Sequence, residues 1–149
     1  MKFSSFEIRE LINSWAAISL AFAILLSPGI FSNEFNKYLL ISTLTVGLGF
    51  VLHELGHKFV AQKYHYGAEF RAFNSMLILA IVMSFFGFIL AAPGAVLIKT
   101  YHITKERNGK ISTAGPLVNI ILALIFLFLT FIFTSGFLNE FSKLGLYIN

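Results

Sequence analysis

The sequence predicts an all-α integral membrane protein with about three spanning helices and one further apolar segment that re-enters or is kinked. Two observations lead to this class. Of the 149 residues, 57% are hydrophobic and only 12% are charged, whereas soluble domains carry about 25% charged residues. The apolar residues, among them 18 phenylalanines, form runs of about 20, the length a helix needs to cross the hydrocarbon core.

Three of these runs predict helices that span the membrane. The first has Trp15 near one end and Pro28-Gly29 near the other. The tail 136–149 is mixed in character and predicts either a cap on the last helix or a further helix. The predicted spanning helices cover residues 11–31, 38–60 and 111–134.

A fourth apolar run, 75–98, is expected to behave differently. It contains Gly87 and the Ala-Ala-Pro-Gly stretch 91–94, which interrupt a straight helix. The loops on either side of it, 58–73 and 99–110, are both basic, and short basic loops stay in the cytoplasm. Both loops can lie on one side only if the run enters and leaves on that side. We therefore favour a re-entrant hairpin over a kinked spanning helix.

Charge and composition place the chain in the cell membrane. Loop 31–37 and the tail are neutral, so they are expected outside, with the N-terminus and the basic loops in the cytoplasm. The net charge of +4 lies mostly in those short loops, which indicates topology and not a nucleic-acid partner. No repeat or linker divides the sequence, so residues 1–149 are expected to form a single multi-pass domain in the lipid bilayer. The sequence does not indicate an oligomeric state.

The second apolar run carries His53, Glu54 and His57, which form the pattern H-E-x-x-H. On a helix the two histidines lie on one face, so both can reach one Zn²⁺ ion. Zinc lowers the pKa of a bound water to about 7, and Glu54 can take its proton and pass it to a leaving amine. The alternative is that the histidines only form hydrogen bonds between helices. Ionisable groups inside a membrane are usually functional, which favours catalysis.

The segment 60–73, just after this motif, alternates enough to predict a short strand edge. Hydrolysis within a membrane requires an unwound substrate, and an unwound strand in lipid needs partners for its backbone. A strand edge can supply these partners by β-augmentation. We therefore expect an extended peptide to pair with this edge.

Together, H-E-x-x-H and the stretch "STAGPLVNIILA" at 112–123 resemble the site-2 protease family of intramembrane zinc metalloproteases, in its short archaeal or bacterial form. The resemblance covers roughly residues 40–135, and both motifs occur in the family's order. It implies that His53 and His57 bind Zn²⁺ and that Glu54 is the general base.

The same resemblance implies a substrate-binding role for Gly115, Pro116 and Asn119. Asn119 would hold the substrate backbone or the developing oxyanion. Each also has an ordinary structural explanation. Asn119 can form a hydrogen bond between helices, and Pro116 suits the first turn of a helix that begins nearby.

The family's third zinc ligand is an aspartate in a Leu-Asp-Gly motif on a later helix, and this chain contains no aspartate. We therefore expect a truncated core that lacks the C-terminal ligand helix, with a weak, open zinc site. There is no cysteine to substitute. Four other residues in basic loops are poor candidates, because solvated roles are commoner there: His65, Glu69, His102 and Glu106.

Two functions follow from these patterns. The first is an intramembrane zinc metalloprotease, an endopeptidase that hydrolyses peptide bonds within or near transmembrane segments of membrane-protein substrates. Its active site would lie near the cytosolic side, and the 149-residue chain would be weakly active or inactive. The alternative is a noncatalytic membrane-binding or metal-binding protein that keeps the protease scaffold.

Overall fold

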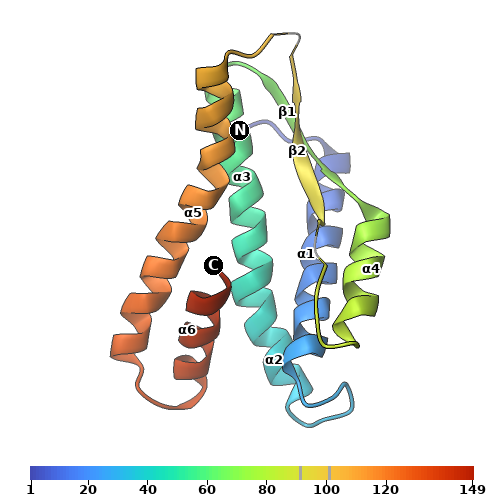
Figure 1. Cartoon of the computed structure of the whole chain (residues 1–149), viewed down its shortest axis with the longest axis vertical. Coiled ribbons are helices and arrows are strands. Elements are labelled where there is room, and N and C mark those ends of the chain that lie inside the picture. The colour runs from blue at the N-terminus through green and yellow to red at the C-terminus, as the bar shows by residue number, and fades with distance from the viewer. Residues whose placement is uncertain (91, 101) are drawn as a thin grey trace.

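The computed structural model describes residues 1–90, 92–100 and 102–149. Figure 1 shows α1, α3 and α5 running along the long axis of the molecule, with the N-terminus and the start of α5 at one end, here called the sheet end. The elements in chain order are α1 (Ser5–Leu26), α2 (Phe35–Ser42), η1 (Thr43–Gly47), α3 (Leu48–Lys63), β1 (Gly67–Ala72), α4 (Asn74–Ser84), β2 (Gly94–Lys99), α5 (Lys105–Ile132) and α6 (Gly136–Ile148).

Three helical stretches are long and apolar enough to cross a membrane, which confirms the predicted fold class. They are Ser5–Leu26, Phe35–Lys63 and Lys105–Ile132. Large apolar side chains on the outside of α5, such as Phe128 and Phe131, are mostly exposed. Such a surface suits lipid and not water. The chain is therefore a membrane protein.

Both ends of α1 differ from the sequence estimate of 11–31: a polar cap extends its start, and a proline shortens its end. The hydroxyl of Ser4 accepts the backbone N–H of Glu7 at 3.1 Å, so α1 begins at Ser5 and not at residue 11. At its other end α1 stops before Pro28, since the residue before a proline disfavours helical geometry. Of the two alternatives for the tail, the structure shows the further helix, α6.

The last spanning helix also begins earlier than predicted. The Thr104 hydroxyl accepts the backbone N–H of Arg107 at 3.3 Å, so α5 starts at Lys105, six residues before the predicted residue 111. Pro116 consequently lies inside α5. The explanation that placed it in a first helical turn is therefore wrong.

The second span contains a wider turn that joins it to α1. Between α2 and α3 the backbone forms the π-helical turn η1. The Trp15 indole N–H donates to the carbonyl of Thr43 at 3.2 Å. Gly47 lies so close to α1 that an added Cβ would be 2.7 Å from the Trp15 ring. The turn therefore packs directly against α1.

The fourth apolar run combines a short helix with a strand. After α4 the chain turns at Gly87, whose φ is +85°, and returns to β2. Strand β2 pairs antiparallel with β1, from Gly67 opposite Lys99 to Ala72 opposite Gly94. The run therefore turns back and ends beside β1, which precedes it, as the hairpin hypothesis requires. Ala91, part of the predicted helix-breaking stretch, lies outside the described residues.

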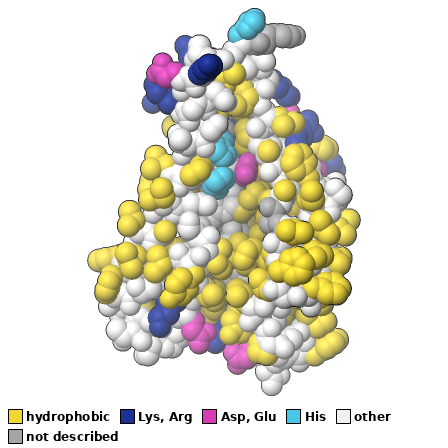
Figure 2. Space-filling model, viewed as in Figure 1, with side chains coloured by type: hydrophobic (Ala, Val, Ile, Leu, Met, Phe, Trp, Pro, Cys, Tyr) yellow, Lys and Arg dark blue, Asp and Glu magenta, His cyan; other side chains and the backbone are white. Residues whose placement is uncertain are grey.

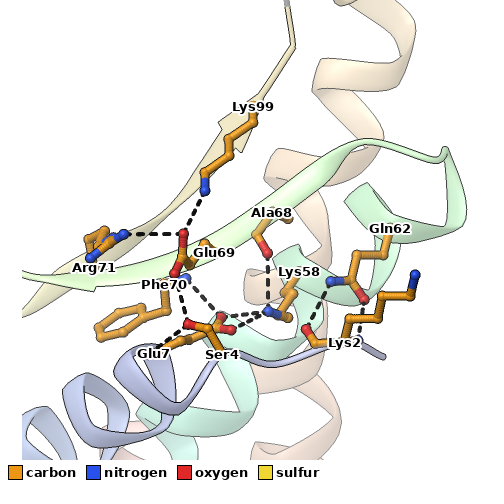
Figure 3. A network of polar contacts seen from close by, with 10 residues as sticks. All are labelled: Lys2, Ser4, Glu7, Lys58, Gln62, Ala68, Glu69, Phe70, Arg71 and Lys99. Atoms are coloured by element: carbon orange, nitrogen blue, oxygen red, sulfur yellow. Dashed lines mark hydrogen bonds and ion pairs between the residues drawn. The ribbon is translucent and has the colours of Figure 1, made fainter.

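Lys58 is not a loop cation, which corrects the sequence-based assignment. It lies on α3, and its side chain is only 1% exposed. Its ammonium group donates to both carboxylate oxygens of Glu7 on α1, at 2.6 and 2.5 Å, and to the carbonyl of Ala68 at 3.0 Å (Figure 3). A buried charge requires this degree of compensation. The pair joins α1, α3 and β1.

The predicted strand is confirmed as β1, but its outer edge is occupied. Glu7 Oε1 accepts the backbone N–H of Phe70 at 2.8 Å, and Glu10 Oε2 accepts that of Ala72 at 3.0 Å. These two N–H groups point away from β2, because alternate residues of a strand face opposite edges. Carboxylates of α1 thus take the place of a neighbouring strand. A further strand, such as an extended peptide, could therefore pair with the sheet only at the outer edge of β2.

Removing the Glu7 carboxylate should destabilise the fold strongly. Glu7→Ala leaves the Lys58 ammonium buried without its counter-ion, and loss of one partner of a buried pair costs about 3–5 kcal/mol. The free energy of unfolding, measured with denaturant in detergent micelles, should fall by that amount. As the control, Glu106→Ala removes an exposed pair with Lys110 and should change little. Equal effects of the two substitutions would contradict the assignment.

Candidate metal centre

The two motif histidines point from α3 towards α5 and meet there. Their Nε2 atoms are 3.1 Å apart, and the rings are nearly perpendicular, with centroids 4.8 Å apart. The Nδ1 atom of His57 donates to the backbone carbonyl of Ile111 on α5 at 2.7 Å. This bond places the His57 proton on Nδ1 and directs the Nε2 lone pair at Nε2 of His53, the arrangement of two histidines that share a metal ion.

Two glycines let α3 and α5 approach closely at this point. A Cβ on Gly56 would lie 3.0 Å from the carbonyl oxygen of Ala114, and a Cβ on Gly115 would lie 2.6 Å from Nε2 of His53 and overlap that of His57. Gly115 therefore forms the surface against which both imidazoles rest. The structure places it beside the predicted metal ligands, whereas the resemblance implied a contact with substrate.

The other predicted site residues separate into two groups. Glu54 and Asn119 line a cleft of about 290 Å³ together with His53. Pro116, by contrast, is exposed on the outer side of α5 and is not among the residues that line this cleft. Figure 2 shows histidine and acidic side chains meeting in a hollow in the middle of a largely hydrophobic face.

Three polar atoms in this region are buried without a hydrogen-bond partner: Nδ1 of His53, Oε2 of Glu54 and Oδ1 of Asn119. Buried polar atoms are nearly always paired, so unpaired ones need an explanation. Glu54 is 8% exposed and lies beside the backbone of Val96 on β2. A site prepared for a ligand that satisfies these atoms would explain them.

The two histidines fit a zinc ion, but they do not complete its coordination. Two tetrahedral zinc ligands with bonds of about 2.1 Å lie about 3.4 Å apart, close to the observed Nε2 separation of 3.1 Å. Within residues 1–90, 92–100 and 102–149, no group of three His, Cys, Asp or Glu side chains could hold a metal ion. Glu69, one of the poor candidates, instead pairs with Arg71 and Lys99.

One similarity decides the family. Over 136 residues the chain is 42% identical to a Methanocaldococcus jannaschii protein named "Putative zinc metalloprotease", and the match covers 91% of this chain and 68% of that protein. The chain belongs to the site-2 protease-like family of this relative. No protein-family model and no solved structure matches the chain. In this zinc metalloprotease family, the convergence of His53 and His57 is the feature expected of a metal centre.

Enlarging Gly115 should weaken metal binding. The added methyl group of Gly115→Ala displaces both imidazoles, and displaced supporting contacts typically cost about 10- to 100-fold in metal affinity. The measurement is competition for zinc between the full chain and a chromophoric chelator. Gly109→Ala is the matched control on the same helix, since nothing lies within 4 Å of its Cβ position. An unchanged zinc affinity in Gly115→Ala would refute the assignment of the metal centre.

Proposed function

We propose that the protein is an intramembrane zinc metalloprotease that hydrolyses peptide bonds within or near transmembrane segments of membrane proteins. The observation that carries this proposal is the approach of His53 Nε2 and His57 Nε2 to 3.1 Å, on a spanning helix, next to a buried glutamate. His53 and His57 would hold the zinc ion. Bound there, zinc supplies Lewis acidity that polarises a peptide carbonyl and lowers the pKa of water to about 7.

The chain's own residues divide the remaining tasks. Glu54 holds the proton taken from the attacking water and delivers it to the leaving amine, for which its unpaired Oε2 is available. The Asn119 side chain faces the same cleft. Its amide N–H groups can donate to the substrate carbonyl, and its unpaired Oδ1 can accept a substrate N–H.

The position of the site along α3 supports hydrolysis at a shallow depth. His57 lies six residues before the end of α3 at Lys63, about 9 Å along the helix axis. Water can therefore reach the site from the sheet end. At the opposite end the Lys37 side chain is paired with Glu34 and Glu140. The excess of lysine and arginine over glutamate lies at the sheet end. This excess favours a cytosolic location for the sheet end.

The outer edge of β2 is suited to hold the unwound substrate. Phe70 lies opposite Val96 in the register, and the Phe70 N–H points away from β2 towards Glu7. The N–H and C=O groups of Val96 must then point away from β1. Because Glu54 lies beside the Val96 backbone, a peptide added at this edge passes the proposed general base. The segment 60–73, which was predicted to pair with the substrate, would thus support substrate binding indirectly, because its strand β1 holds β2 in place.

Replacing the carboxylate of Glu54 tests the catalytic proposal. Glu54→Gln keeps the size of the side chain but removes the proton acceptor, so cleavage of a transmembrane reporter should fall at least 100-fold, within the usual range for a general base. The chemically matched control is Glu106→Gln, at the exposed start of α5, which should cleave normally. Unchanged cleavage in Glu54→Gln would exclude this mechanism. Zinc binding without any cleavage in the unmodified chain would favour the noncatalytic alternative.

A proline at the β2 edge tests the substrate orientation. Ile98 lies opposite Ala68, two positions from the pair of Val96 with Phe70, so its N–H also points outward, but Val96 is the residue beside Glu54. Ile98→Pro therefore removes an outward N–H and leaves the ladder with β1 intact, since proline is tolerated where the N–H faces outward. Reporter cleavage should decrease while zinc affinity and thermal stability stay unchanged. Ile98→Ala, which loses side-chain volume but keeps the N–H, should retain most of the activity. If both variants cleave equally well, substrate does not pair with this edge.

A further inference from the structure

A second and larger cavity lies at the sheet end, away from the metal centre. It has a volume of about 1020 Å³ and opens between the start of α1, the end of α3 and the two strands. Its lining shares no residue with the cleft that contains His53 and Glu54. The proposed protease chemistry therefore does not explain it. Figure 3 shows the polar contacts around this cavity.

The cavity carries an excess of positive charge. Four lysines line it, Lys2, Lys58, Lys63 and Lys99, against the two carboxylates of Glu7 and Glu69. Lys58 is neutralised by Glu7 at the base, and Lys99 by Glu69 at the rim. These two ion pairs leave two lysines, Lys2 and Lys63, which form no ion pair in the described part of the chain.

The ionised state of Glu69 keeps this charge balance constant. The Lys99 ammonium group and then the Ser4 hydroxyl, both hydrogen-bonded to its carboxylate, lower the pKa of Glu69 to about 2. Glu69 therefore remains charged at every physiological pH and continues to neutralise Lys99.

Two partly exposed aromatic side chains line the cavity. Phe59, one turn before Lys63 on α3, is 58% exposed, and Phe3 is 42% exposed. The Phe3 ring also lies against the Lys58 ammonium group, 4.4 Å from its centroid. Exposed apolar rings beside lysine side chains match the boundary between acyl chains and headgroups. A ligand that fills this cavity needs a negative headgroup and an apolar tail.

We propose that this cavity binds the phosphate-bearing headgroup of an anionic membrane lipid, with Lys2 and Lys63 at the phosphate and the acyl chains against Phe3 and Phe59. Basic pockets of this kind between helices on the cytoplasmic side suit acidic headgroups. Each lysine near such a headgroup contributes an attraction equivalent to about fivefold in affinity. The lipid would connect α1 to α3 at the sheet end.

The test is lipid binding by the full chain in nonionic detergent, followed by native mass spectrometry. A short-chain phosphatidylglycerol should bind at least tenfold more tightly than the phosphatidylcholine of equal chain length. Lys2→Gln with Lys63→Gln should weaken phosphatidylglycerol binding about 25-fold. The charge-matched control, Lys105→Gln with Lys143→Gln, should bind as the unmodified chain does, since neither residue lines the cavity.

Three results would overturn the proposal. The first is equal affinity for phosphatidylglycerol and phosphatidylcholine, and the second is an equal loss of phosphatidylglycerol affinity in the two double variants. The third is displacement of phosphatidylglycerol by inorganic phosphate at the same concentration, which would identify a site for free phosphate. Thermal unfolding of each variant without lipid shows whether it is folded. Because the readout does not involve proteolysis, a failure here leaves the protease proposal unaffected, and the reverse also holds.

Discussion

The buried ion pair between Lys58 and Glu7 is the interaction on which the rest of the arrangement depends. A lysine next to a proposed metal ligand, in the apolar body of a membrane protein, is tolerated only if its charge is fully compensated. Glu7 provides this compensation and at the same time accepts an N–H from β1. One carboxylate therefore fixes the position of α1, the orientation of α3 and the edge of β1. The free edge of β2 follows from the same contact.

The second constraint is the close approach of α3 and α5. Glycines at 56 and 115 remove the side chains that would separate these helices, and the bond from His57 to Ile111 crosses the contact. Packing and hydrogen bonding thus act on the same imidazole. The spacing of the ring nitrogens is consequently set by two rigid helices and not by a loop, which is the condition for a well-defined metal site.

Local patterns predicted the spanning helices and the convergence of the histidines well, because both depend on helical periodicity. Contacts between distant segments were not predictable in this way. Lys58 was assigned to a basic loop. An ionisable residue beside an apolar run requires a counter-ion, and a search for that counter-ion could have identified Glu7. Strand β2 was included in an apolar run because its residues suit both a membrane segment and a buried strand. Pro93-Gly94 was the signal for a boundary there.

The wide turn η1 sets the rotational phase between the two halves of the second span. Each residue of a helix advances the side-chain direction by about 100°, and a π-turn accommodates one residue more than a regular turn. At the turn itself the span faces α1, where Gly47 lies against the Trp15 ring. Above it, the span turns its imidazoles to α5. The loss of one residue within 43–47 would swing the histidine face about 100° around the helix axis and away from Ile111, with the chemical groups themselves unaltered.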